Sequence, residues 1–111
     1  MTIIAIESKA DFTSKILSTT DLVVLDCWAT WCGPCKAIEP KLEEFSAAFS
    51  QVKFYKLNVD DPAVADVVQE LNVRAMPTVM FFEKGEKVTE IVGADLHGIE
   101  RGIQALVATL V

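Results

Sequence analysis

Residues 22–35 combine an apolar strand, two cysteines and the start of a helix. They read Leu22-Val23-Val24-Leu25-Asp26-Cys27-Trp28-Ala29-Thr30-Trp31-Cys32-Gly33-Pro34-Cys35. The run of Val and Leu is typical of a central strand covered by helices on both faces. Pro34 suits the first turn of a helix, because its missing N–H would be unpaired there in any case. The stretch therefore predicts a strand that ends in a dithiol at a helix N-terminus.

Strand-like and helix-like patterns alternate through the rest of the chain. Runs of Val, Ile and aromatic residues predict further strands at residues 2–6, 52–59, 78–82 and 88–92. Three further helices are predicted from their capping residues. These are Ser8, with an acid three residues on, Asp61 before Pro62, and Asp95. The helix after the cysteines runs to about residue 49. It should bend at Pro40, which lacks an N–H and clashes with the preceding turn.

Apolar residues recur at helical spacing in each predicted helix. Those expected to face the interior are Phe12, Ile16 and Leu17; Ile38, Leu42, Phe45 and Phe49; Val64, Val67, Val68 and Leu71; and Leu96, Ile99, Ile103, Leu106 and Leu110. The element order gives right-handed crossovers between parallel strands, then an antiparallel hairpin through residues 83–86. We therefore expect a single α/β domain over residues 1–111, with one mixed sheet between two layers of helices.

The composition is that of a globular, acidic protein. Of 111 residues, 51% are hydrophobic and 23% charged, and the formal net charge is −6. Nucleic acid is not expected as a partner, because binding it needs clustered Lys and Arg and here they are scattered. No apolar run approaches the ~20 residues that cross a bilayer. The start of the chain lacks the basic region of a signal peptide. A cytoplasmic protein without membrane contact is therefore expected.

The three cysteines, Cys27, Cys32 and Cys35, lie within nine residues. This is not the even, dispersed set of a secreted disulfide framework. A zinc or iron–sulfur site is one alternative. It would need four ligands, however, and beyond the cysteines the chain offers the distant His97. A purely structural disulfide is another, although so short a loop adds little stability. A redox-active pair, Cys32 and Cys35, is favoured.

The position of this pair at a helix N-terminus matters more than its spacing. Unpaired N–H groups and the helix dipole stabilise a thiolate there, and the thiolate is the nucleophile of disulfide exchange. Asp26 is a carboxylate in an apolar run. If it is buried, its pKa rises toward neutrality and it could take the proton of Cys35; the alternative is that it faces solvent.

The Met76–Pro77 bond would be trans on propensity alone.

Several motifs together resemble the thioredoxin family. The segment Ala29-Thr30-Trp31-Cys32-Gly33-Pro34-Cys35-Lys36 is similar to the family's active-site signature. Asp26 stands where the family has its buried acid, Lys56 where it has a lysine beside that acid, and Pro40 where its long helix bends. Met76-Pro77-Thr78 is similar to the family's cis-proline loop, and Val92-Gly93-Ala94 to the glycine segment of its substrate groove. The resemblance covers almost the whole chain.

The resemblance implies a five-stranded mixed sheet in the order 1-3-2-4-5 with four helices, and a protein disulfide reductase. Cys32 would attack a target disulfide, and the less exposed Cys35 would resolve the mixed disulfide. Asp26 would transfer the proton of Cys35, and Lys56 would tune Asp26. Trp31, Gly33 and Pro34 would form the active-site loop. The substrate groove would comprise Trp31, Ala75, Met76, Pro77 in a cis bond, Gly93 and Ala94.

The resemblance also implies partners. The protein would bind no cofactor and no metal, and would receive electrons from NADPH through a separate thioredoxin reductase. Its targets would include peroxiredoxins, methionine sulfoxide reductase and ribonucleotide reductase, and it would act as a monomer. A different class of function is a binding module that uses the same fold as a scaffold. The intact cysteine pair, Asp26 and Pro77 argue against that class.

Cys27 departs from the family, which usually has an aromatic residue at this position. We expect a buried, inert thiol, with a regulatory thiol as the alternative. His97 is expected on the surface of the last helix. Trp28 should pack at the end of the sheet, whereas Trp31 is the better candidate for contact with partners.

Overall fold

The computed structural model describes residues 3–110. Within this range the strands are β1 (Ile3–Ala5), β2 (Leu22–Trp28), β3 (Val52–Asn58), β4 (Thr78–Glu83) and β5 (Glu86–Val92). The α-helices are α1 (Lys9–Phe12), α2 (Gly33–Ala48), α3 (Ala65–Leu71) and α4 (Leu96–Ala108). A π-helical turn (Thr13–Leu17) extends α1, and a 3-10 turn (Pro62–Val64) leads into α3.

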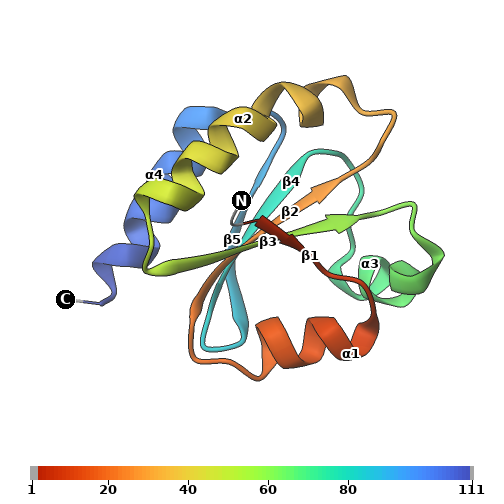
Figure 1. The fold of residues 1–111 in the computed structure, drawn as a ribbon, viewed down its shortest axis with the longest axis horizontal. Coiled ribbons are helices and arrows are strands. Elements are labelled where there is room, and N and C mark those ends of the chain that lie inside the picture. The colour runs from red at the N-terminus through yellow and green to blue at the C-terminus, as the bar shows by residue number, and fades with distance from the viewer. Residues whose placement is uncertain (1–2, 111) are drawn as a thin grey trace.

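The strands form one mixed sheet in the order β1-β3-β2-β4-β5, which confirms the implied topology. β3 pairs parallel with β1 and β2, whereas β4 pairs antiparallel with β2 and β5. Figure 1 shows α2 and α4 on one face of the sheet and α1 and α3 on the other. β2 therefore lies at the centre, and its C-terminal end leads the chain into the cysteine segment.

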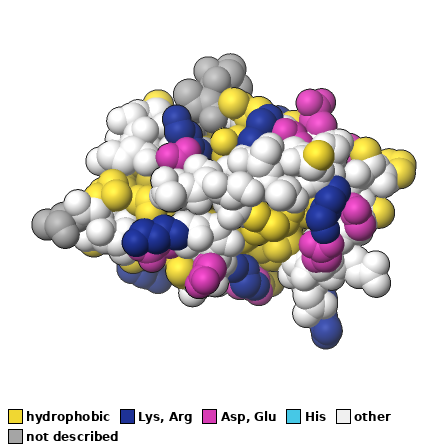
Figure 2. Space-filling view, turned by 90° about the horizontal axis from the view of Figure 1, so that it is seen from below, with side chains coloured by type: hydrophobic (Ala, Val, Ile, Leu, Met, Phe, Trp, Pro, Cys, Tyr) yellow, Lys and Arg dark blue, Asp and Glu magenta, His cyan; other side chains and the backbone are white. Residues whose placement is uncertain are grey.

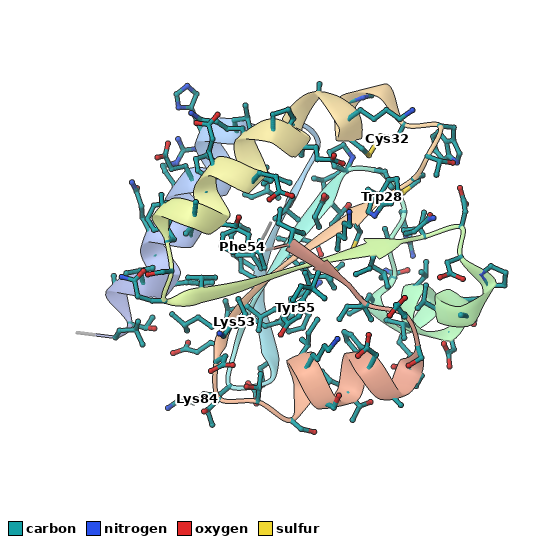
Figure 3. The ribbon with its side chains drawn as sticks, viewed as in Figure 1. Trp28, Cys32, Lys53, Phe54, Tyr55 and Lys84 are labelled. Carbon is teal, nitrogen blue, oxygen red and sulfur yellow. A yellow bond between two sulfur atoms is a disulfide. The ribbon has the colours of Figure 1, made fainter. Side chains whose placement is uncertain are left out.

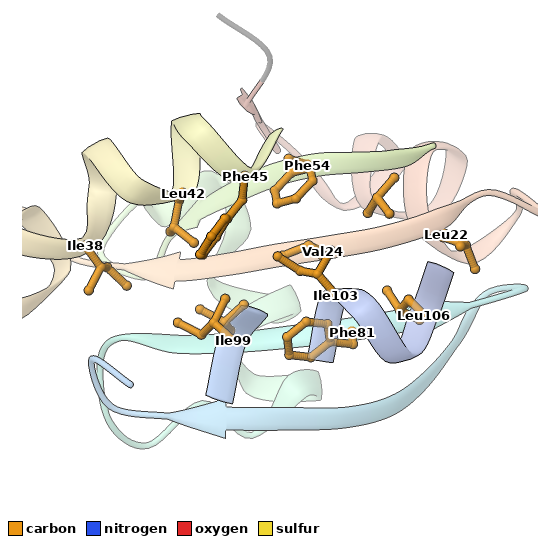
Figure 4. Close-up of a cluster of buried hydrophobic side chains, with 12 residues drawn as sticks. Leu22, Val24, Ile38, Leu42, Phe45, Phe54, Phe81, Ile99, Ile103 and Leu106 are labelled. Carbon is orange, nitrogen blue, oxygen red and sulfur yellow. The ribbon is translucent and has the colours of Figure 1, made fainter. Parts of the chain in front are cut away.

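The period-two alternation of β2 divides its side chains between two cores. Leu22 and Val24 belong to the cluster in Figure 4, where side chains of α2 and α4 pack on the sheet. Val23 and Leu25 belong to the cluster on the opposite face, beneath α1 and α3. Burial on both faces is the reason why this strand is a continuous apolar run. Because Asp26 shares the parity of Val24, its carboxyl lies on the face that α2 covers.

The helix starts that the sequence predicts carry the expected caps. Ser8 Oγ accepts a hydrogen bond from the Asp11 N–H at 3.0 Å. Asp95 Oδ1 accepts one from the Gly98 N–H at 2.9 Å. Asp61 Oδ1 accepts one from the Ala63 N–H at 3.0 Å. These carboxyl and hydroxyl oxygens satisfy N–H groups that a helix start leaves unpaired.

The prediction of inward-facing side chains was wrong at two positions. Leu17 is exposed, and Leu110 is 58% exposed. Leu17 lies in the π-helical turn, where the spacing of a regular α-helix no longer applies. Leu110 lies beyond the last residue of α4, Ala108, so no helix turns it toward the core.

Several predicted boundaries also change, as at the first strand and the last hairpin. The first strand is shorter than residues 2–6, and Thr2 lies outside the described residues. The last hairpin turn is shorter as well, because Glu83 and Glu86 already pair as strand residues. Its two central residues, Lys84 and Gly85, have φ angles of 53° and 80°. Two positive φ angles are typical of the tight turn whose twist matches antiparallel strands.

The surface carries both signs of charge. Figure 2 shows Lys and Arg interspersed with Asp and Glu on one face, with hydrophobic side chains visible between them. Ion pairs link Lys9 to Glu70 and, at 2.9 Å, Lys15 to Asp11. Over residues 3–110, no helix has the length and apolar content that crossing a bilayer requires.

Candidate active site

The two cysteines lie at the N-terminus of α2, at the end of the sheet opposite the Lys84 hairpin (Figure 3). Cys32 is the N-cap residue and is joined to Cys35 by a disulfide with a Cα–Cα distance of 5.3 Å. The Cys35 N–H donates to Cys32 Sγ at 3.1 Å. A thiolate at this sulfur would therefore receive a backbone hydrogen bond as well as the field of the helix dipole.

The expectation that Cys35 is the less exposed of the pair is wrong for this state. Both cysteines are 3% exposed, because the disulfide holds the two sulfurs together at the same opening turn. Gly33 and Pro34 lie between them, exposed, in the first turn of α2. The two sulfurs therefore differ in chain position rather than in exposure.

Asp26 is buried beneath α2, with 6% of its surface exposed, so it does not face solvent. Burial raises the pKa of its carboxyl, the Glu39 charge adds to this rise and the Lys56 charge opposes it, so that the pKa is about 7. Its Oδ1 has no hydrogen-bond partner among the described residues. A buried carboxyl that exchanges its proton near neutral pH can serve as an acid or a base there.

Lys56 lies directly opposite Asp26 in the parallel pairing of β2 and β3. Its Nζ is 5.8 Å from the centroid of the Trp28 ring, a distance at which a cation and an aromatic face attract. Trp28 packs against the cluster that holds both cysteines, as expected of a residue at the sheet end. Acid, cation and indole thus lie together at the end of the sheet where α2 begins.

The loop before β4 meets the disulfide. The Met76–Pro77 bond is cis. Met76 packs against the buried cluster of Ala29, Cys32 and Cys35. The Pro77 carbonyl accepts a hydrogen bond from the Gly93 N–H at 2.8 Å, which joins this loop to the end of β5. Ala75 and Ala94, which neighbour Met76 and Gly93 in the sequence, are both exposed.

Trp31 is 67% exposed, and its Nε1 donates to Asp60 Oδ2 at 2.7 Å. Sequence reasoning found Trp31 but missed Asp60, which lies 29 residues away along the chain. It also missed Glu39, whose charge acts on Asp26. Two signals were available in the sequence. Asp60 is an acid just after a predicted strand, and Glu39 is an acid one helical turn after Cys35.

Cys27 and His97 lie apart from this group. Cys27 is fully buried in the core beneath α1 and α3, and burial raises the pKa of its thiol. His97 is exposed on α4, as expected. Across residues 3–110, His, Cys, Asp and Glu side chains form no group of three that could hold a metal ion.

The arrangement supports two-electron exchange between thiols and disulfides. One sulfur caps a helix, the second is bonded to it, and a carboxyl with a pKa of about 7 lies beneath the same helix. The exposed Trp31 directly precedes Cys32, and Met76 of the loop before β4 packs against the cluster that holds both cysteines. Disulfide exchange requires a nucleophilic sulfur, a resolving sulfur and a proton acceptor.

Comparison with known proteins gives concordant matches over most of the chain. A protein-family model described as Thioredoxin matches residues 3–105. A thioredoxin of Aspergillus fumigatus is 48% identical over 99 residues, 87% of this chain and 88% of that protein. The solved thioredoxin of Malassezia sympodialis has a TM-score of 0.85 at 40% identity, covering 93% of this chain and 89% of that one. Another solved structure has a TM-score of 0.86 at 33% identity and covers 93% of this chain and 94% of that one. It comes from work on the thiol resolving mechanism in yeast mitochondrial 1-Cys peroxiredoxin via glutathione and thioredoxin systems.

Proposed function

This chain belongs to the thioredoxin family of dithiol–disulfide oxidoreductases and has its disulfide reductase function, and we propose that Cys32 and Cys35 divide the chemistry between them. The observation that carries this proposal is the Cys32–Cys35 disulfide at the N-terminus of α2. Residues 1–111 act as one domain in this account.

In the first step the Cys32 thiolate attacks one sulfur of a target disulfide. The bond between the two target sulfurs breaks as the bond to Cys32 forms, and the second target sulfur leaves as a thiolate. The helix N-terminus and the Cys35 N–H stabilise the attacking thiolate. Cys32 takes this role because it caps the helix, whereas Cys35 follows within its first turn.

In the second step Cys35 resolves the mixed disulfide. Asp26 accepts the proton of the Cys35 thiol, and the resulting thiolate attacks Cys32. The target sulfur leaves, so the target has gained two electrons and the pair has returned to the disulfide. A carboxyl with a pKa of about 7 is well suited to this exchange. Lys56, whose charge lowers that pKa, tunes Asp26.

The target segment lies in a groove between the indole and the loop that meets the disulfide. Trp31 offers an exposed apolar face, and Met76 packs against the cluster that holds both cysteines. Pro77, Ala75, Gly93 and Ala94 complete the border, with Gly33 and Pro34 in the active-site loop. Recognition through backbone hydrogen bonds, as in an added strand, would admit targets of unrelated sequence.

The oxidised pair is re-reduced by a separate NADPH-dependent thioredoxin reductase. Peroxiredoxins are one class of target; the yeast structure named above supports this choice. Methionine sulfoxide reductase and ribonucleotide reductase are others. The protein works as a monomer in the cytoplasm, where thiols are kept reduced.

Insulin reduction by dithiothreitol tests the proposal against the scaffold alternative. Catalytic amounts of the protein should hasten the precipitation of the freed insulin chains. The Cys32→Ser variant should give the uncatalysed rate. A parent protein that left the rate unchanged would contradict the disulfide chemistry assigned to this site.

A further inference from the structure

A pocket of about 430 Å³ opens beside the loop that contacts the disulfide. Its lining includes Asn72, Arg74, Ala75, Thr78, Glu90 and Val92. Ala75 adjoins Met76, which packs against the cluster of Ala29, Cys32 and Cys35, so the pocket borders the loop that contacts this cluster. Thr78 and Val92 are register partners on β4 and β5, which fixes the floor of the pocket on the sheet.

Arg74 supplies an uncompensated positive charge at this pocket. Its Nε donates to Asn72 Oδ1 at 3.1 Å, and Asn72 itself has a left-handed φ of 56° at the end of α3. Within the described part of the chain, Arg74 makes no ion pair and no further hydrogen bond. Its two terminal nitrogens are therefore available for a planar, two-pronged contact with a carboxylate.

The acidic residue of the lining is already neutralised. Glu90 Oε1 lies 2.7 Å from Lys87 Nζ, on the exposed face of β5. The charge that the pocket offers to a bound segment is thus that of the guanidinium. This local sign is opposite to the net charge of −6 of the whole protein.

We propose that this pocket receives an acidic side chain of the target polypeptide, Asp or Glu, held by the Arg74 guanidinium. The inference rests on the proposed function, because the target segment must first be engaged at Cys32. An extended segment advances ~3.3 Å per residue. We therefore expect the acid that enters the pocket to lie two or three residues from the attacked cysteine. Arg74 thus sets a preference among targets.

The test uses pairs of disulfide-closed peptides that differ only by Glu or Gln at one position. That position is two or three residues before or after one cysteine. The rate constant for reduction of each peptide by excess reduced protein is measured at low salt, and the Glu to Gln ratio serves as an internal reference. Arg74→Gln is compared with Arg101→Gln, an equal charge change at an exposed residue of α4 outside the pocket.

For at least one position, the parent and Arg101→Gln should reduce the Glu peptide about three- to fivefold faster, as expected of one exposed ion pair. The ratio should fall to about one in Arg74→Gln and shrink in high salt, which screens exposed charges. Equal rates for Glu and Gln at every position in the parent, or a preference that survives in Arg74→Gln, would overturn the inference. Failure to reduce any peptide would instead contradict the proposed function.

Discussion

Asp26 and Lys56 face each other as register partners on β2 and β3, yet no ion pair joins them. The Lys56 ammonium lies over the Trp28 ring instead. Asp26 is left as a buried carboxyl whose pKa is raised to about 7. A paired carboxylate would stay ionised and would be a poor proton acceptor at neutral pH. The separation of acid and cation therefore serves the proton transfer proposed for this site.

The contribution of Asp26 to the free energy of unfolding should fall as the pH rises from about 4 to about 7. The unfolded chain releases the Asp26 proton near the ordinary value of 3.8, whereas the folded protein holds it to about pH 7. The folded state therefore binds more protons in this window, and raising the pH favours unfolding. The full penalty, present above pH 7, is on the order of 4 kcal/mol.

Asp26→Asn should remove this penalty. Chemical denaturation of the oxidised protein at pH 4.5, 6 and 8 should show the variant gaining stability over the parent as the pH rises. Asp21→Asn, at an exposed position before β2, should follow the parent. A constant difference between Asp26→Asn and the parent across this range would rule out a buried, titrating Asp26.

Asp26→Asn should also slow the release of the reduced target at neutral pH. Without the carboxylate, the Cys35 thiol loses its proton acceptor and must release its proton without that help. We expect single-turnover resolution of the mixed disulfide to slow on the order of 10- to 100-fold at pH 7. Equal rates for variant and parent from pH 6 to 8 would dismiss the proton-transfer role.

Glu39 and Lys56 should shift the titration of Asp26 in opposite directions. The Glu39 charge raises the pKa of Asp26 and the Lys56 charge lowers it. Glu39→Gln should therefore move the Asp26 titration to lower pH, and Lys56→Gln should move it to higher pH. The Asp26 carboxyl ¹³C resonance reports this directly. Glu44→Gln, on the same helix, should leave it in place, and shifts of the same sign would refute the electrostatic account.

Gly102→Ala should destabilise the fold, because an added Cβ would lie 2.5 Å from Cζ of the fully buried Phe81 ring. We expect a loss of about 1 to 2 kcal/mol, the cost of overpacking reduced by the better helix propensity of Ala. Gly33→Ala is the matched control, since its Cβ would meet no heavy atom within 4 Å. Equal unfolding free energies for the two variants would show that the Phe81 ring moves to make room for the added Cβ at no cost in stability.

The sequence predicted best those features of the fold that depend on a local pattern of residues, such as a buried strand or a helix cap. The apolar run before Asp26 required burial on both faces of a strand, and the helix caps at Ser8 and Asp95 formed as expected. The Met76–Pro77 bond is a different case. Propensity favoured trans, and only the family resemblance pointed to the cis bond that the structure has.

Contacts between distant segments were the part that local patterns could not supply. The Trp31–Asp60 hydrogen bond joins residues from different strand ends, and neither residue signals it alone. The equal burial of Cys32 and Cys35 depends on the bond between them. The effect of Glu39 on Asp26 depends on how α2 lies over the sheet. Each is a property of the assembled fold.

The division of labour between the two sulfurs is tested most directly by trapping. Cys35→Ser, incubated in its reduced form with a disulfide-containing protein, should accumulate a mixed disulfide through Cys32, visible as the summed mass and lost on addition of dithiothreitol. Cys32→Ser should accumulate none, because its remaining thiol lies within the helix turn rather than at its cap. A stable adduct formed by Cys32→Ser and not by Cys35→Ser would contradict the assignment of Cys32 as the attacking sulfur.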